Sequence, residues 1–238
     1  MRPSHTPTGT IVLQEKVIVV TGASGALGKV VVETALARGA RVAAVDYAAA
    51  HTAPTPQLLQ LGGVDLTDAA QAKKAIDAAA SHFGKLDALV NIAGGFAFET
   101  VADGDPRTWQ RMYALNVATA LNASRAAIPH LLASRAGRIV NIGAFGALQA
   151  ASGMGGYAAS KSGVHRLTEA LAAEHKGKIT VNAVLPSIID TAANRESMPK
   201  SDFSKWVTPQ ELAEVILFLA SDAASAVTGA LLPVTGRV

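Results

Sequence analysis

The sequence contains no cysteine among its 238 residues. Disulfide bonds, a thiol nucleophile and cysteine-ligated metal sites are therefore excluded. Charged residues make up only 16% of the chain, and the net charge of +3 is spread along the sequence. Nucleic-acid-binding proteins usually gather basic residues into a patch or stripe, so we expect no nucleic-acid partner.

Long apolar runs and a signal peptide are also lacking. The late run Val215–Ala220 is far shorter than the about 20 residues that a membrane-spanning helix needs. The first ten residues are polar, include two prolines, and have no apolar stretch of the kind that secretory signals carry. The histidines show no His-x-x-x-His spacing, so no metal site is expected. We predict a cytoplasmic protein without a membrane partner.

Residues 16–46 contain the features around which the rest of the chain is organised. The β-branched run Val17–Val20 predicts a buried strand, and the helical stretch Ala26–Arg38 ends at Gly39. A second apolar run, Arg41–Val45, completes a strand–helix–strand unit. Three evenly spaced glycines lie between the first strand and the helix, namely Gly22, Gly25 and Gly28.

This glycine turn predicts a dinucleotide-binding site. Glycines let the backbone approach a pyrophosphate, and the start of the helix supplies free N–H groups with the positive end of the dipole. Asp46 follows the second strand, where its carboxylate can accept hydrogen bonds from adenosine ribose hydroxyls. The same carboxylate would repel a 2′-phosphate, so we expect NAD rather than NADP. The residues expected around the pyrophosphate are Gly22, Ser24, Gly25, Ala26, Leu27 and Gly28.

Apolar runs alternate with helical stretches beyond Asp46. Further strands are predicted at Val64–Asp65, Leu86–Ile92, Arg138–Ile142, Lys178–Leu185 and Gly229–Val234, and further helices at Ala69–Phe83, Pro106–Ser134, Tyr157–Lys176 and Pro209–Ser221. The alternation predicts a single-domain α/β Rossmann fold over residues 14–238, with a doubly wound, mostly parallel seven-stranded sheet and helices on both faces. Residues 1–13 are expected to be a flexible leader.

Three details refine this prediction. Pro129 predicts a kink or an early end in its helix. Thr208 and Glu211 fit a capping box at the start of the last helix. Ser187–Val207 shows no clear period, which indicates a mobile loop or a small lobe.

Tyr157 and Lys161 lie four residues apart on a predicted helix, so both side chains point to one face. A free tyrosine has a pKa near 10, and a nearby ammonium favours the phenolate. At ~5 Å and an effective dielectric of about 20, the attraction is roughly 3 kcal/mol, enough to lower the pKa by on the order of two units. We predict Tyr157 as a general acid/base, and Lys161 as its tuner and as an anchor for the nicotinamide ribose.

These motifs together resemble the short-chain dehydrogenase/reductase family from Leu13 to Val234. The matching pieces are the glycine turn, Asp65, Asn91-Ile92-Ala93-Gly94, Asn116, Tyr157-Ala158-Ala159-Ser160-Lys161 and Pro186–Thr191. The resemblance implies an NAD-dependent oxidoreductase that acts on a small molecule and forms a homodimer or homotetramer. It implies that Asn116 helps to hold a proton relay to Lys161. The cofactor contacts that it implies are Asp65, Leu66, Asn91, Ala93, Gly94, Tyr157, Lys161, Pro186, Ile188 and Thr191.

The largest departure from the family pattern is Ala144. The family normally has a serine thirteen residues before the tyrosine, and that serine orients and polarises a substrate carbonyl. Losing one such donor typically costs about 2.7–4 kcal/mol of transition-state stabilisation. Ser152 is the available substitute, so the expected substrate contacts are Ala144, Ser152 and Tyr157. The family also usually has glycine at the positions of Ala26 and Ser187.

Two alternatives stay open. Quinonoid dihydropteridine reductases resemble this chain in the Gly25–Gly28 turn, in Ala144, and in the late segment 185–206. Their substrate is a conjugated imine-like ring for which a serine is dispensable, whereas Asn116 fits the carbonyl-reducing majority better. The second alternative is an NADH-binding regulator without turnover, motivated by Ala144 and Ser187. Retention of the tyrosine, lysine and asparagine argues against it.

Overall fold

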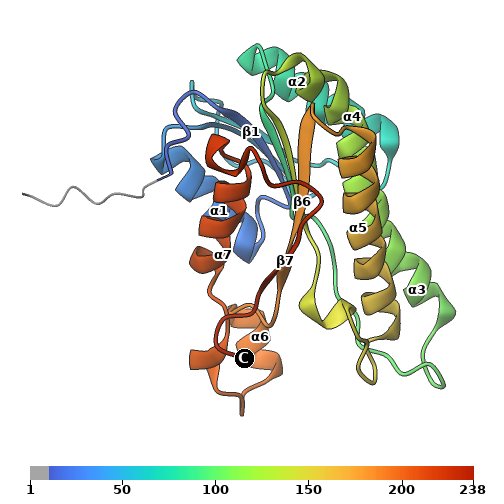
Figure 1. The fold of residues 1–238 in the computed structure, drawn as a ribbon. Helices are drawn as coiled ribbons and strands as arrows, with labels where there is room; N and C mark the ends of the chain where they lie inside the picture. Colours follow the sequence, from blue (N-terminus) through green and yellow to red (C-terminus); the bar gives the residue numbers. More distant parts are fainter. Residues whose placement is uncertain (1–10) are drawn as a thin grey trace, which may run out of the picture.

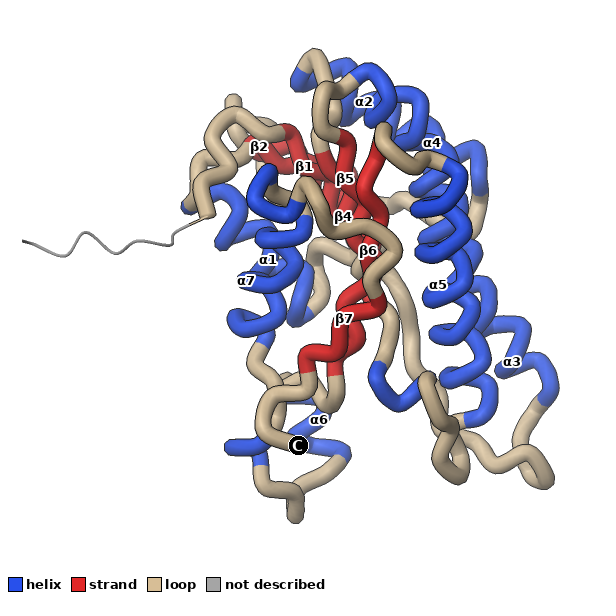
Figure 2. Tube along the Cα trace, viewed as in Figure 1, coloured by secondary structure: helices blue, strands red, loops and turns tan. Residues whose placement is uncertain are grey.

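Seven parallel strands form one sheet in a computed structural model that describes residues 11–238. The strand order is β3-β2-β1-β4-β5-β6-β7, and the sheet runs through the middle of the molecule (Figure 2). The strands are β1 (Val17–Thr21), β2 (Arg41–Val45), β3 (Leu58–Leu61), β4 (Ala88–Asn91), β5 (Gly137–Ile142), β6 (Ile179–Pro186) and β7 (Leu231–Val234). Together with the helices on both faces, this order confirms the predicted doubly wound Rossmann fold.

Helices cover both faces of the sheet (Figure 1). They are α1 (Ala26–Ala37), α2 (Ala69–Phe83), α3 (Pro106–Tyr113), α4 (Thr119–Ala133), α5 (Gly155–Glu174), α6 (Ala192–Ser197) and α7 (Pro209–Leu219). One apolar core lies between the sheet and the helices α1 and α7, and a second lies between the sheet and α2, α4 and α5. Two cores explain why β1, β4 and β5 are buried along their whole length.

Three elements differ from the prediction. The third strand is Leu58–Leu61 rather than Val64–Asp65, and it is a short edge strand that pairs with β2. This strand was not predicted, because it has only four residues and two prolines, Pro54 and Pro56, precede it closely. The early end that was one of the two outcomes predicted for Pro129 does not occur at the proline, since α4 continues past it to Ala133. The predicted helix 106–134 is interrupted by a π-helical turn at Ala114–Ala118.

The segment Ser187–Val207 folds as a small lobe, one of the two predicted outcomes. It contains α6 and a 3-10 turn at Phe203–Lys205, and a bridge between Ile189 and Val207 closes its base. The capping box of Thr208 and Glu211 is confirmed. Leu13 is fully buried against the core, and the first ten residues of the predicted leader lie outside the described residues.

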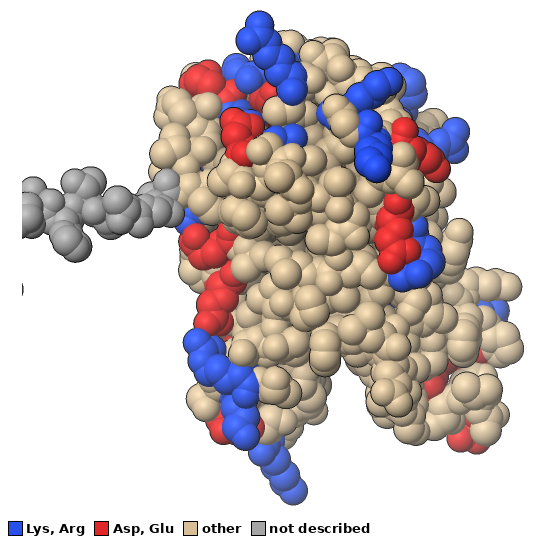
Figure 3. Space-filling model, in the orientation of Figure 1, with Lys and Arg blue, Asp and Glu red and all other residues tan. Residues whose placement is uncertain are grey.

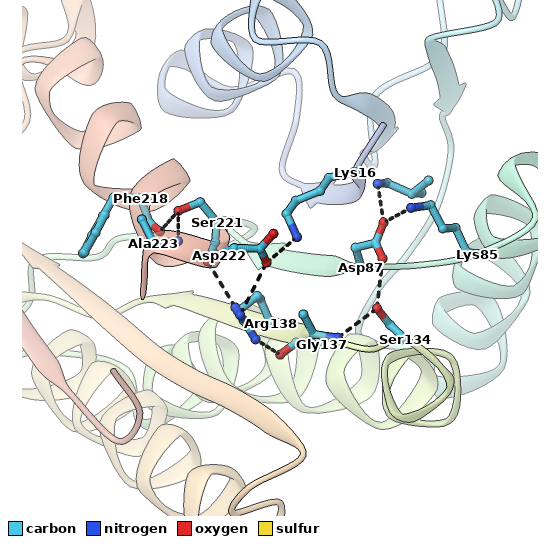
Figure 4. Close-up of polar contacts among 12 residues, drawn as sticks. Lys16, Lys85, Asp87, Ser134, Gly137, Arg138, Phe218, Ser221, Asp222 and Ala223 are labelled. Carbon is cyan, nitrogen blue, oxygen red and sulfur yellow. Dashed lines mark hydrogen bonds and ion pairs between the residues drawn. The ribbon is translucent and has the colours of Figure 1, made fainter. Parts of the chain in front are cut away.

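The amino ends of the strands meet in a network of polar side chains (Figure 4). Asp87 accepts hydrogen bonds from the Val17 N–H at 2.9 Å and the Ser134 hydroxyl at 2.9 Å. On the other side of this network, Lys16 and the buried Arg138 both face Asp222, at 2.8 and 3.6 Å. Hydrogen bonds and ion pairs thus connect the segments at the amino ends of the strands. At the carboxyl ends of the strands, the chain continues into loops. Within residues 11–238 no helix has the length and apolar character needed to cross a membrane.

Candidate active site

The loop after β1 forms a tight turn with no space for side chains. Gly22 has φ +66°, and a Cβ placed on it would lie 2.7 Å from the backbone nitrogen of Ala93. A Cβ on Gly28 would lie 2.1 Å from the Gly22 carbonyl oxygen. Helix α1 begins next to this turn with Gly25 as its N-cap and without a capping side chain. The turn therefore allows a close approach to its backbone, and no side chain caps the N–H groups of the first turn of α1, as a pyrophosphate site requires.

The other residues predicted around the pyrophosphate differ in their exposure to solvent. Ser24 and Ala26 are exposed, so the methyl group of Ala26 is accommodated where the family usually has glycine. Leu27 is buried in the core beneath the turn. Leu27 thus supports the turn from below.

Asp46 lies across the same turn. Its carboxylate accepts hydrogen bonds from the Ser24 N–H at 2.8 Å and the Ala48 N–H at 2.9 Å. The arginines closest to it in sequence are engaged elsewhere: Arg38 pairs with Glu214 and Arg41 with Glu15. Asp46 thus places its negative charge beside the glycine turn, and Arg38 and Arg41 are paired with other carboxylates.

Asp65, Leu66 and Asn91 are engaged with the protein itself. The Asp65 carboxylate accepts bonds from the backbone and hydroxyl of Thr67 at 2.8 and 2.7 Å, and Leu66 is buried. The Asn91 amide donates to Asn141 on β5 at 2.9 Å. Its side chain thus ties neighbouring strands together. Contact of Asn91, Ala93 and Gly94 with a cofactor stays a prediction.

Lys161 and Tyr157 project from the first turns of α5. The Lys161 ammonium donates a hydrogen bond to the Ile142 carbonyl at the end of β5, at 2.8 Å. Burial lowers the pKa of Lys161 to about 8 and raises the pKa of Tyr157 to about 12. The prediction that Lys161 lowers the pKa of Tyr157 is therefore wrong for this structure. Desolvation of the phenol dominates, because the ammonium is directed to a carbonyl.

Asn116 lies in the π-helical turn, and its side chain bonds to the loop after β4 and to helix α5. Its amide nitrogen donates to the Gly95 carbonyl at 3.1 Å and to the Ser160 hydroxyl at 2.9 Å, and its oxygen accepts the Gly95 N–H at 3.0 Å. The Ser160 hydroxyl in turn donates to the Tyr157 carbonyl at 2.7 Å. Asn116 thus fixes the loop after β4 against the helix that carries Tyr157.

Gly94 shows how closely these groups converge. A Cβ placed on it would lie 2.5 Å from the Asn116 side-chain oxygen and 3.5 Å from the Lys161 nitrogen. The structure therefore brings the asparagine and lysine side chains together beside Gly94, and the proton relay between them stays a prediction. Gly95 and Ser160 were not predicted as partners of the asparagine, although Gly95 directly follows the motif Asn91–Gly94 and Ser160 lies within the motif Tyr157–Lys161.

Ala144 follows β5 and packs with Tyr157, Ala147 and Ala158 in a small apolar cluster. Ser152, the expected substitute for a serine at 144, is exposed on the turn before α5. Within residues 11–238 no hydrogen bond joins its hydroxyl to Tyr157, and its role stays a prediction. The position next to the phenol thus carries a methyl group.

A buried histidine, which the sequence did not single out, stands behind this position. The Ala144 N–H donates to the His165 ring at 3.3 Å. A Cβ on Gly143 would lie 2.5 Å from the same ring, so the glycine makes room for it. Burial, with further contributions from Arg166 and Lys161, lowers the pKa of His165 to about 4, so the ring is neutral.

The late segment that resembles dihydropteridine reductases is held together by its own side chains. Arg195 forms two bonds with the Asp190 carboxylate, at 2.5 and 2.7 Å, and its guanidinium lies 4.9 Å from the centre of the Phe203 ring. The Phe203 and Trp206 rings are 4.8 Å apart. These residues therefore contact one another within the lobe.

The cofactor contacts predicted after β6 lie at the base of this lobe. Pro186 ends β6, and the Ile188 carbonyl accepts the Val207 N–H at 3.1 Å. Thr191 is the N-cap of α6 and accepts the Asn194 N–H at 3.2 Å. The Ser187 hydroxyl donates to the Thr235 carbonyl at 2.8 Å, which gives a structural use for the serine.

Comparisons with known proteins agree with this geometry. Residues 16–202 match the family described as short chain dehydrogenase. The chain is 34% identical to 2-(S)-hydroxypropyl-CoM dehydrogenase 3 of Xanthobacter autotrophicus, with 94% of this chain and 96% of that protein covered. It is 30% identical to the 3-oxoacyl-[acyl-carrier-protein] reductase FabG of Thermotoga maritima, with coverages of 94% and 98%.

A solved structure extends the likeness to three dimensions. Carveol dehydrogenase from Mycobacterium avium, in complex with NAD, superposes with a TM-score of 0.84 at 28% identity, over 95% of this chain and 98% of that one. The glycine turn, the converging lysine and asparagine, and these matches along nearly the whole length lead to one conclusion. The chain belongs to the short-chain dehydrogenase/reductase family of oxidoreductases.

Proposed function

We propose that this protein is an NAD-dependent oxidoreductase that transfers a hydride to or from a small carbonyl, alcohol or imine substrate. The observation that carries the proposal is the convergence of Lys161 and Asn116 beside Gly94, next to Tyr157. This group lies at the same edge of the sheet as the glycine turn. When bound, the nicotinamide supplies or accepts the hydride.

The side chains of the protein supply the proton. With a pKa near 12, the Tyr157 phenol stays protonated at neutral pH and holds the proton that the substrate oxygen or nitrogen needs in the reducing direction. Lys161, with a pKa near 8, is mostly protonated at pH 7 and holds the positive charge beside the ribose position. Asn116 keeps the loop after β4 in place, so the three groups stay aligned.

Asp46 supports the choice of NAD over NADP. Its carboxylate is fixed by two backbone N–H groups beside the pyrophosphate turn. Replacement by asparagine removes the negative charge and keeps the shape. We expect Asp46→Asn to weaken NADH binding and narrow the preference for NADH over NADPH, measured by fluorescence titration with both cofactors. If Asp46→Asn prefers NADH over NADPH as strongly as the wild type does, the role of Asp46 in cofactor choice is contradicted.

The main test follows NADH oxidation at 340 nm with a panel of small ketones and diketones. We expect turnover with at least one of them, and its near-complete loss in Tyr157→Phe, while NADH affinity measured by fluorescence stays close to that of the wild type. Equal turnover in wild type and variant would refute the role of the phenol. NADH binding without any turnover would favour the regulator.

A second candidate function is reduction of a quinonoid dihydropterin. The specific observation in its favour is the methyl group of Ala144 beside Tyr157, since an imine-like ring does not need the missing hydroxyl. The test uses a quinonoid dihydropterin as acceptor. Fast turnover that is lost in Tyr157→Phe supports this candidate, and absence of turnover rejects it. Cytoplasmic location and assembly into a homodimer or homotetramer stay predictions.

A further inference from the structure

The end of the sheet that carries Tyr157 opens into a hollow. Figure 3 shows it between the lobe 187–207 and the loops that follow β4 and β5. Its walls are uncharged in this view, and the charged side chains of the lobe lie away from it. The two loops on one side of this hollow carry Phe96 and Ala144, and both residues pack against Tyr157. The loops are therefore candidates for the surroundings of a substrate.

Aromatic and aliphatic side chains are exposed on these loops. Phe96 is 60% exposed, and the edge of its ring contacts the Tyr157 ring with the two centres 5.0 Å apart. Phe98 is 64% exposed and lies over Gly153, where a Cβ would come within 2.3 Å of its ring. Phe145, directly after Ala144, is also exposed. Exposed rings gathered around a reactive group indicate a surface that an apolar ligand covers.

Charge is absent from the same walls. Residues 92–98 and 143–156 contain no acidic, basic or histidine residue. The next charged residue is Glu99, whose carboxylate accepts hydrogen bonds from the Thr108 hydroxyl at 3.0 Å and from the Asp105 N–H at 3.2 Å. Arg195, on the facing lobe, is neutralised by Asp190. A phosphate, sulfonate or carboxylate on the substrate would thus lose its hydration without gaining a cation from these segments.

On the basis of the proposed function, we propose that the substrate is a neutral carbonyl compound, or its alcohol, with an aromatic group next to the reacting carbon. Phe96 is the residue that determines this specificity, because its ring packs against the Tyr157 ring at 5.0 Å between centres and is still 60% exposed, so a bound aromatic group can contact it. Phe98 extends the same wall. Substrates with a carboxylate, or carried on coenzyme A, are disfavoured.

The test compares four probes with NADH: 1-phenyl-1,2-propanedione, 2,3-butanedione, phenylpyruvate and acetoacetyl-coenzyme A. The first two probes differ in the aromatic ring. The third carries a carboxylate, with a methylene between its ring and its carbonyl group, and the fourth carries coenzyme A. We expect kcat/KM for the phenyl diketone to exceed that of each other probe by at least about tenfold. A preference for phenylpyruvate or acetoacetyl-coenzyme A, or equal values for the two diketones, would overturn the proposal.

Variants locate the effect. Phe96→Ala is expected to raise KM for the phenyl diketone by about 3- to 10-fold and to change KM for butanedione little, since an aromatic contact is lost only with the former. Phe96→Leu should bring KM for the phenyl diketone part of the way back to the wild-type value. Leu132→Ala, an exposed apolar residue on α4, is the control and should leave both KM values unchanged. Phe98→Arg should improve phenylpyruvate relative to the phenyl diketone. Unchanged ratios in Phe96→Ala would refute the role of this ring.

Binding separates this proposal from the proposed function. Saturation-transfer NMR on the NADH complex reports whether each probe binds, independently of turnover. Selective binding of the phenyl diketone without turnover would support the substrate class and contradict the reaction. Turnover without selectivity for the neutral aromatic probe would support the reaction and overturn the substrate class. Absence of both selective binding and turnover would overturn both.

Discussion

Restoring a serine at position 144 tests the chemistry of the site directly. Ala144 is extended, with φ −156° and ψ 137°, and is only 6% exposed. Its methyl group lies in the apolar cluster that includes Tyr157. In Ala144→Ser, the new hydroxyl therefore joins the surroundings of the phenol without a change in backbone conformation, since serine adopts extended backbone readily.

The magnitude follows from two opposing effects. A donor placed where negative charge develops contributes about 2.7–4 kcal/mol in the transition state, or roughly 100- to 1,000-fold in kcat. Before substrate binds, the hydroxyl sits in an apolar cluster, which costs about 1–3 kcal/mol of stability if it finds no partner. We thus expect a less stable variant with a higher kcat toward a ketone, and little gain toward a dihydropterin, whose nitrogen takes its proton from Tyr157.

Steady-state NADH oxidation at saturating cofactor measures the change in kcat, and urea unfolding measures the change in stability. Ala147→Ser is the matched control, because Ala147 lies in the same cluster and is 7% exposed. It should lose stability without gaining activity. If Ala144→Ser leaves kcat for every ketone unchanged while folding and NADH binding persist, the reasoning about the missing hydroxyl is refuted.

Three further predictions follow from close contacts and burial. Gly28→Ala places a Cβ 2.1 Å from the Gly22 carbonyl oxygen and should weaken NADH binding sharply in a fluorescence titration; an unchanged Kd would show that the turn does not bind the cofactor. Gly94→Ala pushes against the Asn116 side-chain oxygen from 2.5 Å and should lower kcat by about 100-fold, with a smaller change in NADH affinity. His165 has its pKa lowered from 6.5 to about 4, so the unfolded chain binds more protons between these values and stability falls as pH drops through them. The fall in unfolding free energy amounts to about 3 kcal/mol. In urea unfolding at pH 7, 5 and 4, the His165→Gln variant should lose less unfolding free energy than the wild type. An equal dependence on pH in the two proteins would contradict the role given to His165.

The geometry of the glycine turn and the position of Tyr157 and Lys161 on one helix were predictable, because each depends on local sequence. Three glycines after a β-branched run, and two side chains four apart on a helix, specify their geometry within one or two elements. The capping box at Thr208 is local in the same sense. The alternation of strands and helices then sufficed to predict the parallel sheet.

What the sequence did not predict depends on contacts between distant segments. The hydrogen bond from Lys161 to Ile142 and the burial of both side chains reverse the expected effect on the pKa of Tyr157. The ring of His165 fills the space that Gly143 leaves, and nothing in either local pattern indicates the other. Burial and tertiary packing decide these features, and a periodic pattern carries no information about either.

The π-helical turn at Ala114–Ala118 has a consequence for how this enzyme can change over evolution. A π turn accommodates one residue more than the α-helical path around it. Deleting one residue there would restore a regular helix, and the core would lose little. Asn116, however, would be rotated away from Gly95 and Ser160, its partners at 3.0 and 2.9 Å. The length of this helix is therefore constrained by the active site rather than by the stability of the fold, and a one-residue deletion should yield a folded protein that binds NADH but turns over slowly.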